Sequence, residues 1–124
     1  MTWNAFHNRG EILHRAIAIA DVCRDGVLPM DLDGVTAVFD DEADLLAAMM
    51  LKWHTRLSGN IERALAEQPL DLEAAVATAW RDTSNQMPGV RAIMDRFALP
   101  TERADLHAMI ERAAEREWAK LAIQ

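Results

Sequence analysis

The stretch that decides the fold runs from residue 40 to residue 67 and reads DDEADLLAAMMLKWHTRLSGNIERALAE. Its apolar residues recur at spacings of three and four, which is the period of an α-helix. The main apolar stripe consists of Leu46, Met50, Trp53, Leu57, Ile61 and Ala64. Asp40 or Asp41 precedes the stripe as a helix N-cap, and Pro69 follows its end. We therefore predict one long helix that ends at about Glu67.

Leu45, Met49 and Leu51 lie off the main stripe of this helix. Its first half is therefore apolar on more than one side. That pattern is typical of a central helix, or of a helix whose second face meets a partner.

Amphipathic segments precede and follow the long helix. The first runs from about Asn4 to Arg24, and four more are capped or opened by Asp31, Asp71, Pro88 and Thr101. β-Branched residues nowhere alternate with polar ones over four or more positions, so no strand is expected. We predict an all-α fold in which residues 1–124 form a single domain, an antiparallel helical bundle of about five to six helices.

The composition excludes several classes of protein. The chain has 124 residues, of which 51% are hydrophobic and 27% charged, with a net charge of -7. Such a negative charge repels nucleic-acid phosphates and anionic lipids, so neither nucleic acid nor a membrane is an expected partner. The single cysteine, Cys23, has no partner for an intramolecular disulfide, which fits a cytoplasmic location. No cofactor motif is present.

His7, Glu11 and His14 are spaced by four and three residues on the first predicted helix. These side chains are of metal-ligand type. They lie, however, in the middle of the polar arc of that helix, opposite its apolar face. We expect a solvated polar face and no metal site there.

A second group of residues surrounds His54, which lies within the apolar arc of the long helix. Glu117 lies within the apolar arc of the last helix, where an unpaired carboxylate would be costly. Either the two side chains pair across the helices, or His54 bonds to a backbone carbonyl while Glu117 bends to solvent at the helix end. The expected ligand-binding residues are Met49, Met50, Trp53, His54, Trp80 and Glu117.

The region before the long helix is strongly acidic and also carries many apolar residues. Its surface suits a basic or amphipathic protein partner, although capping and core packing explain the same residues. The expected interface residues are Val35, Val38, Phe39, Leu45 and Met49.

These patterns favour a non-enzymatic protein-interaction or regulatory module that self-associates. The alternative is a bundle, including an enzyme, that binds a small molecule or metal in a pocket around His54 and Trp53. No catalytic residue is identified.

We predict that the protein forms a homodimer or higher oligomer, because apolar surface left uncovered in one chain favours a twofold contact. Sedimentation equilibrium at micromolar concentration measures the mass directly. Met49→Glu is expected to weaken assembly while the fold stays intact, and a monomer mass for the unaltered protein would contradict the prediction.

Overall fold

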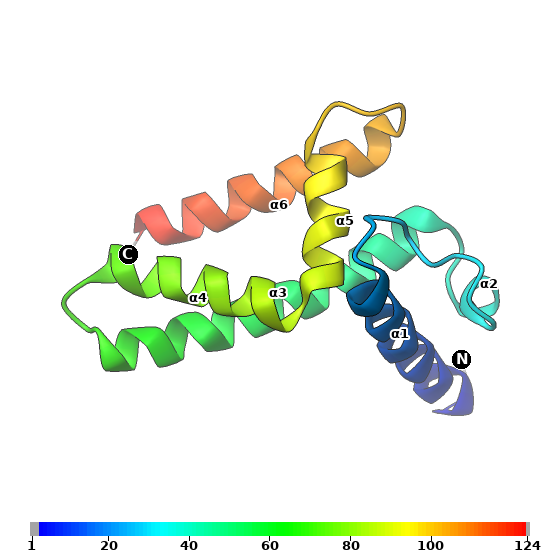
Figure 1. The fold of residues 1–124 in the computed structure, drawn as a ribbon, viewed down its shortest axis with the longest axis horizontal. Helices are drawn as coiled ribbons and strands as arrows, with labels where there is room; N and C mark the ends of the chain where they lie inside the picture. Colours follow the sequence, from blue (N-terminus) through cyan, green and yellow to red (C-terminus); the bar gives the residue numbers. More distant parts are fainter. Residues whose placement is uncertain (1–2, 124) are drawn as a thin grey trace.

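The computed structural model describes the backbone of residues 3–123 and the side chains of residues 8–116. The described residues form helices joined by turns and no strands, which confirms the predicted all-α class. The helices are α1 (Trp3–Cys23), α2 (Val35–Val38), α3 (Glu42–Glu67), α4 (Leu72–Gln86), α5 (Pro88–Ala98) and α6 (Ala104–Ile123). Figure 1 shows α3 and α4 as an antiparallel hairpin, with α5 crossing between the hairpin and α6. Within the described residues, no helix combines the length and the apolar character needed to cross a membrane.

α3 is the central helix of the fold. It begins after Asp41, whose carboxylate accepts a hydrogen bond from the Asp44 backbone N–H at 2.9 Å. Leu45, Leu46 and Met49 are each 0% exposed. The helices that approach α3 are α1, α4, α5 and α6. Burying each of these large side chains contributes about 1.5–3 kcal/mol, so the apolar first half of α3 holds the bundle together.

Polar side chains fix α4 against α3. Asn60 of α3 is only 3% exposed, and its Nδ2 donates to Thr83 Oγ1 at 2.8 Å and to Gln86 Oε1 at 3.2 Å. The Thr83 hydroxyl donates in turn to the Ala79 carbonyl at 2.7 Å. Buried polar groups are costly unless they are paired. These hydrogen bonds therefore select one register between the two helices of the hairpin.

α5 crosses α1 at a point where the two backbones nearly touch. A Cβ atom at Gly89 would lie 2.0 Å from the carbonyl carbon of Ala20. The Gly89 N–H donates to Asp21 Oδ1 at 2.8 Å, so a carboxylate of α1 caps the first turn of α5. The crossing requires glycine at this position.

Arg9 joins α1 to the segment that leads into α3. Its guanidinium donates to the Val38 carbonyl at 2.6 Å and to the Asp44 carboxylate at 3.1 and 3.3 Å, and lies 4.4 Å from the centre of the Phe39 ring. Asp44 also accepts a hydrogen bond from the Asp40 backbone N–H at 3.0 Å. The hydrogen bonds from Arg9, and then from Asp40, hold the pKa of Asp44 below its usual value.

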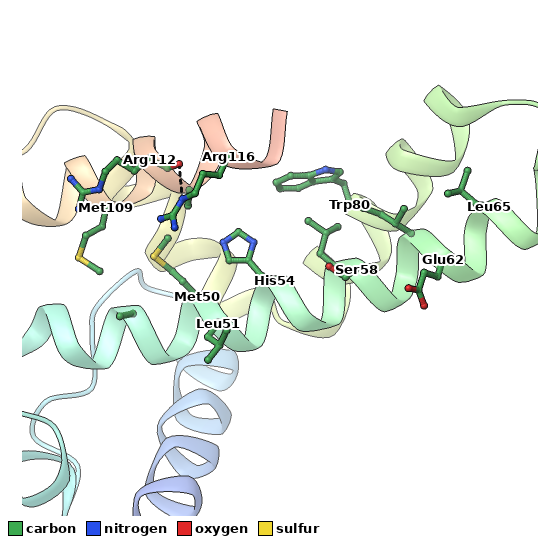
Figure 2. A pocket seen from close by; sticks show the side chains of 14 residues that line it. Met50, Leu51, His54, Ser58, Glu62, Leu65, Trp80, Met109, Arg112 and Arg116 are labelled. Atoms are coloured by element: carbon green, nitrogen blue, oxygen red, sulfur yellow. Dashed lines mark hydrogen bonds between the residues drawn. The ribbon is translucent and has the colours of Figure 1, made fainter. Parts of the chain in front are cut away.

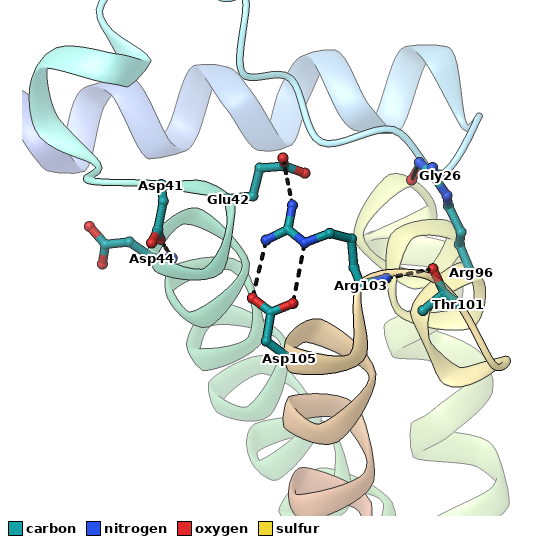
Figure 3. A network of polar contacts seen from close by, with 8 residues as sticks. All are labelled: Gly26, Asp41, Glu42, Asp44, Arg96, Thr101, Arg103 and Asp105. Atoms are coloured by element: carbon teal, nitrogen blue, oxygen red, sulfur yellow. Dashed lines mark hydrogen bonds and ion pairs between the residues drawn. The ribbon is translucent and has the colours of Figure 1, made fainter.

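Arg103 joins the start of α6 to the start of α3 (Figure 3). Its Nη1 donates to Glu42 at 2.7 Å, and its Nε and Nη2 donate to the two carboxylate oxygens of Asp105 at 3.2 and 3.1 Å. The hydrogen bond from Arg103 lowers the pKa of Asp105. These exposed contacts each contribute little energy, but together they define where α6 departs from the core.

Two predicted helix starts are wrong. Asp31 does not cap α2, because that helix begins only after Gly34, whose φ of 92° is left-handed, and no side chain caps it. Thr101 does not cap α6, because that helix begins only at Ala104. The Thr101 hydroxyl instead accepts a hydrogen bond from the Arg103 backbone N–H at 3.3 Å, before the helix starts. The predicted Asp71 cap of α4 is confirmed, because the Asp71 carboxylate accepts a hydrogen bond from the Ala74 backbone N–H at 3.0 Å.

We expect Gly89→Ala to destabilise the protein by about 2–3 kcal/mol, because the added methyl group overlaps the backbone of α1. Gly59→Ala is the matched control, since nothing lies within 4 Å of a Cβ there. That control substitution removes a glycine from a helix interior and is expected to stabilise by about 0.5–1 kcal/mol. Urea unfolding midpoints measure both effects. Equal stability of Gly89→Ala and the unaltered protein would contradict the close crossing of α1 and α5.

We expect Asp44→Asn to destabilise the protein at pH 7 by about 1 kcal/mol, because the ion pair with Arg9 is lost. A carboxyl whose pKa is lowered by folding stabilises the protein above its unfolded pKa, and this contribution disappears as the pH falls through the folded pKa. The stability difference between variant and unaltered protein should therefore shrink in acid. Thermal unfolding between pH 7 and pH 2 measures it, with the exposed Asp33→Asn as control. A difference that stays constant with pH would contradict the assignment.

Candidate functional site

A groove of about 840 Å³ lies between α3, α4 and α6 (Figure 2). The residues that α3 contributes are Ala47, Met50, Leu51, His54, Leu57, Ser58, Ile61, Glu62 and Leu65. They recur at spacings of three and four, so they share one face of the helix. From the first to the last, α3 rises about 27 Å at ~1.5 Å per residue. The groove therefore follows α3 for about five turns.

This face of α3 lies beside the face that is buried in the core. Met50 and Leu57 are 6% and 3% exposed, Ile61 and Leu65 are half-buried, and Leu51 is 67% exposed. Burial along the groove thus grades from the core to open surface. The half-buried side chains offer apolar area that a bound molecule would cover.

Trp80 of α4 forms a wall of the groove and is supported from behind. Its ring centre lies 5.7 Å from that of the fully buried Trp53, with the ring planes at 56°. The Arg91 guanidinium lies 5.3 Å from the Trp53 ring centre and 5.4 Å from the Trp80 ring centre, and Arg91 also pairs with Asp95. Cation–π and ring contacts of this kind favour one ring orientation. The Trp80 wall is therefore preformed.

α6 supplies the other wall through Met109 and Ala113. α6 approaches α5 and α3, but within the described residues it does not approach α4. The described residues of α6 therefore complete the groove against α3 and not against α4.

Charged side chains are distributed unevenly along the groove. Arg112 and Arg116 lie on α6, where both are exposed, and neither guanidinium pairs with a carboxylate in the described part of the chain. Figure 2 shows these two arginines near Met50 and His54, whereas Glu62 lies toward the opposite end. The groove thus has a cationic end and an acidic end.

The structure brings together three of the six predicted ligand-binding residues, since Met50, His54 and Trp80 all line the groove. Met49 and Trp53 do not line it, because both are 0% exposed and belong to the core behind it. Glu117 lies outside the residues whose side chains are described, so a pairing between His54 and Glu117 stays a prediction.

The predicted interface residues require a correction. Val35, Phe39, Leu45 and Met49 are at most 1% exposed within one chain, and only Val38 is half-buried. A side chain already covered by its own chain has no area left for a second copy. Met49→Glu would therefore place a charge in the core and disrupt the fold, contrary to the expectation that the fold survives. Self-association itself stays a prediction.

The acidic region before α3 is largely used within the chain. Asp41 caps α3, Asp44 pairs with Arg9, and Glu42 pairs with Arg103. On the other side of the region, Asp21 and Asp25 accept hydrogen bonds from backbone N–H groups. This internal use weakens the case for a basic partner at this surface.

Glu11 and His14 are exposed on α1, and the His7 side chain lies outside the described residues. Among the residues that the structure describes, no group of three or more His, Cys, Asp or Glu side chains is arranged to hold a metal ion.

Sequence reasoning missed Ser58, Met109, Arg112 and Arg116 as groove residues. Ser58 lies one helical turn after His54, a spacing that could have identified it. The α6 residues could not be identified, because their place in the groove depends on the direction in which α6 leaves α5.

No family model, curated protein or solved structure matches this chain. The site itself is a largely apolar groove about 27 Å long, with Arg112 and Arg116 at one end. Such a shape is typical of sites that bind a helix or an elongated amphiphile.

Proposed function

We propose that this chain is a non-enzymatic protein-interaction module whose groove binds an amphipathic helix of a partner protein. The observation that carries the proposal is the largely apolar, partly exposed face of α3 from Ala47 to Leu65, which His54, Ser58 and Glu62 interrupt. A face of this length corresponds to a helix of about 18 residues at ~1.5 Å per residue.

The shape of the groove suits a helix. Helices pack with their axes about 8–10 Å apart by placing the side chains of one into the grooves of another. α3 and α4 already form such a pair. A partner helix lying in the groove would place apolar residues at spacings of three, four and seven against the half-buried Ile61, Leu65 and Trp80.

The lining favours binding over catalysis. Most of the residues that line the groove are apolar, and the hydroxyl of Ser58 makes no hydrogen bond within the described part of the chain. A nucleophile is ordinarily activated by an adjacent base. The proposed partner helix belongs to another protein, and the expected location is the cytoplasm.

A second candidate function is the binding of an elongated anionic amphiphile. A volume of about 840 Å³ lies within the usual range of small-molecule sites, about 300–1,000 Å³. The alkyl chain would lie along Leu57 and Ile61, and the anionic head would meet Arg112 or Arg116. The length of the α3 face, about 27 Å, makes a helix the better occupant.

The proposal is tested with a fluorescein-labelled 18-residue helical peptide that has leucines at spacings of three and four and neutral polar residues elsewhere. We expect saturable binding by fluorescence anisotropy. Ser58→Trp, which fills the groove from an exposed position, is expected to weaken binding at least about tenfold, equivalent to ~1.4 kcal/mol. Lys52→Trp is the matched control, because Lys52 is exposed on α3 outside the groove.

Amide chemical-shift changes locate the bound peptide. Changes confined to α3, α4 and α6, and lost in Ser58→Trp, support the proposal. Equal binding by Ser58→Trp and Lys52→Trp would show that the peptide binds elsewhere and would overturn it. Displacement of a fluorescent hexadecanoate from the groove, with no peptide binding, would favour the amphiphile instead.

A further inference from the structure

The two arginines on α6 are exposed beside the groove and differ from the three described arginines that form ion pairs. Arg9, Arg91 and Arg103 each pair with a carboxylate of this chain, and Arg96 donates to the Gly26 carbonyl. Arg112 and Arg116 form no such ion pair within the described residues; Arg116 Nε only donates to the Arg112 carbonyl at 3.4 Å. Their side chains stand beside the groove with hydrogen-bonding capacity left over.

Arg112 and Arg116 are four residues apart, so they project from one face of α6 one turn from each other. Both line the groove, near Met50 and His54 (Figure 2). Two guanidinium groups at this spacing match two carboxylates placed one turn apart on a docked helix. Arginine is suited to such a role because its planar group binds carboxylates in a bidentate manner.

The opposite end of the groove carries Glu62, which is exposed on α3. The separation of Glu62 from His54 is eight residues, or about 12 Å along the helix at ~1.5 Å per residue. A docked helix therefore meets positive charge at one end of the groove and negative charge at the other. That difference distinguishes the two directions in which a helix could lie.

We infer that the partner helix is acidic at the end that meets Arg112 and Arg116, with carboxylates at positions i and i+4, and basic at the end that meets Glu62. This inference rests on the proposed function, since it assigns charge and direction to the helix proposed for the groove. The apolar face supplies affinity, and the charges select the partner and its orientation.

The net charge of -7 gives the cationic wall a further consequence. The net charge repels an acidic helix, whereas Arg112 and Arg116 attract its carboxylates at this end of the groove. Charges at the rim of a binding site act mainly on the association rate and make it sensitive to salt. The acidic helix is thereby directed to this end of the groove.

The test compares two 18-residue peptides that share one leucine pattern. The first carries Glu at positions i and i+4 near one end and Lys near the other, and in the second these charges are reversed without moving the leucines. At low salt we expect the two to differ about threefold to tenfold in affinity for the unaltered protein, since exposed ion pairs are individually weak. Paramagnetic labels at one end of each peptide report its direction, and we expect the Glu end beside α6 in both complexes.

The double variant Arg112→Glu/Arg116→Glu places carboxylates on α6, which repel the Glu end of each peptide. We expect the bound peptides to reverse direction, so that their Lys end lies beside α6. Arg15→Glu/Lys52→Glu is the matched control, because it changes the net charge equally at exposed residues outside the groove. It should leave the direction of both peptides unchanged.

The outcomes separate the two proposals. If both peptides bind in the groove but with equal affinity and no preferred direction, the charge inference is overturned and the helix-binding function stands. If neither peptide binds, the function fails and the inference fails with it. An equal effect of the two double variants would show that net charge, and not the arginine pair, controls binding, which also overturns the inference.

Discussion

Burial of the first half of α3 is the constraint on which the rest of the structure depends. Leu45, Leu46 and Met49 point to more than one side of the helix and are all fully covered. No single neighbouring helix can cover such a surface, so α1, α4, α5 and α6 gather around it. In the second half of α3, Asn60 and Thr83 hold the hairpin partner α4 in place. The groove follows the side of α3, from Ala47 to Leu65, that these neighbours cover less completely.

The direction of α5 decides where α6 leaves the core. Gly89 allows α5 to lie directly on the backbone of α1, and Asp21 caps it there. α5 consequently crosses the bundle, and the chain leaves it near the start of α3, where Arg103 meets Glu42. Leu106, near the start of α6, is fully buried, whereas α6 as a whole does not approach α4 within the described residues. A close contact between α1 and α5 thus shapes a distant surface.

The helices and the capping residues Asp41 and Asp71 were predictable from sequence, because periodicity and capping are local properties. The buried second face of α3 was also predictable, but what covers it was not. Met49 was therefore assigned to an interface, although other helices of the same chain bury it. Half of the candidate pocket residues reached the groove because they lie on its side of α3 or α4. The contribution of Arg112 depends on the path of α6, which no local pattern encodes.

The chain holds the α3, α4 and α6 surfaces of the groove in place by different contacts, and these contacts bear on binding. Asn60 pins the hairpin, and Trp53 and Arg91 support Trp80 from behind, so the α3 and α4 surfaces are ordered before any partner arrives. A surface that is ordered before binding loses less side-chain conformational entropy when a partner binds. α6 is anchored against α3 and α5 by the buried Leu106, Ile110 and Ala113. A helix entering the groove would therefore dock against apolar surfaces that the chain has already ordered, and the exposed arginines of α6 would be the side chains that adjust to its charges.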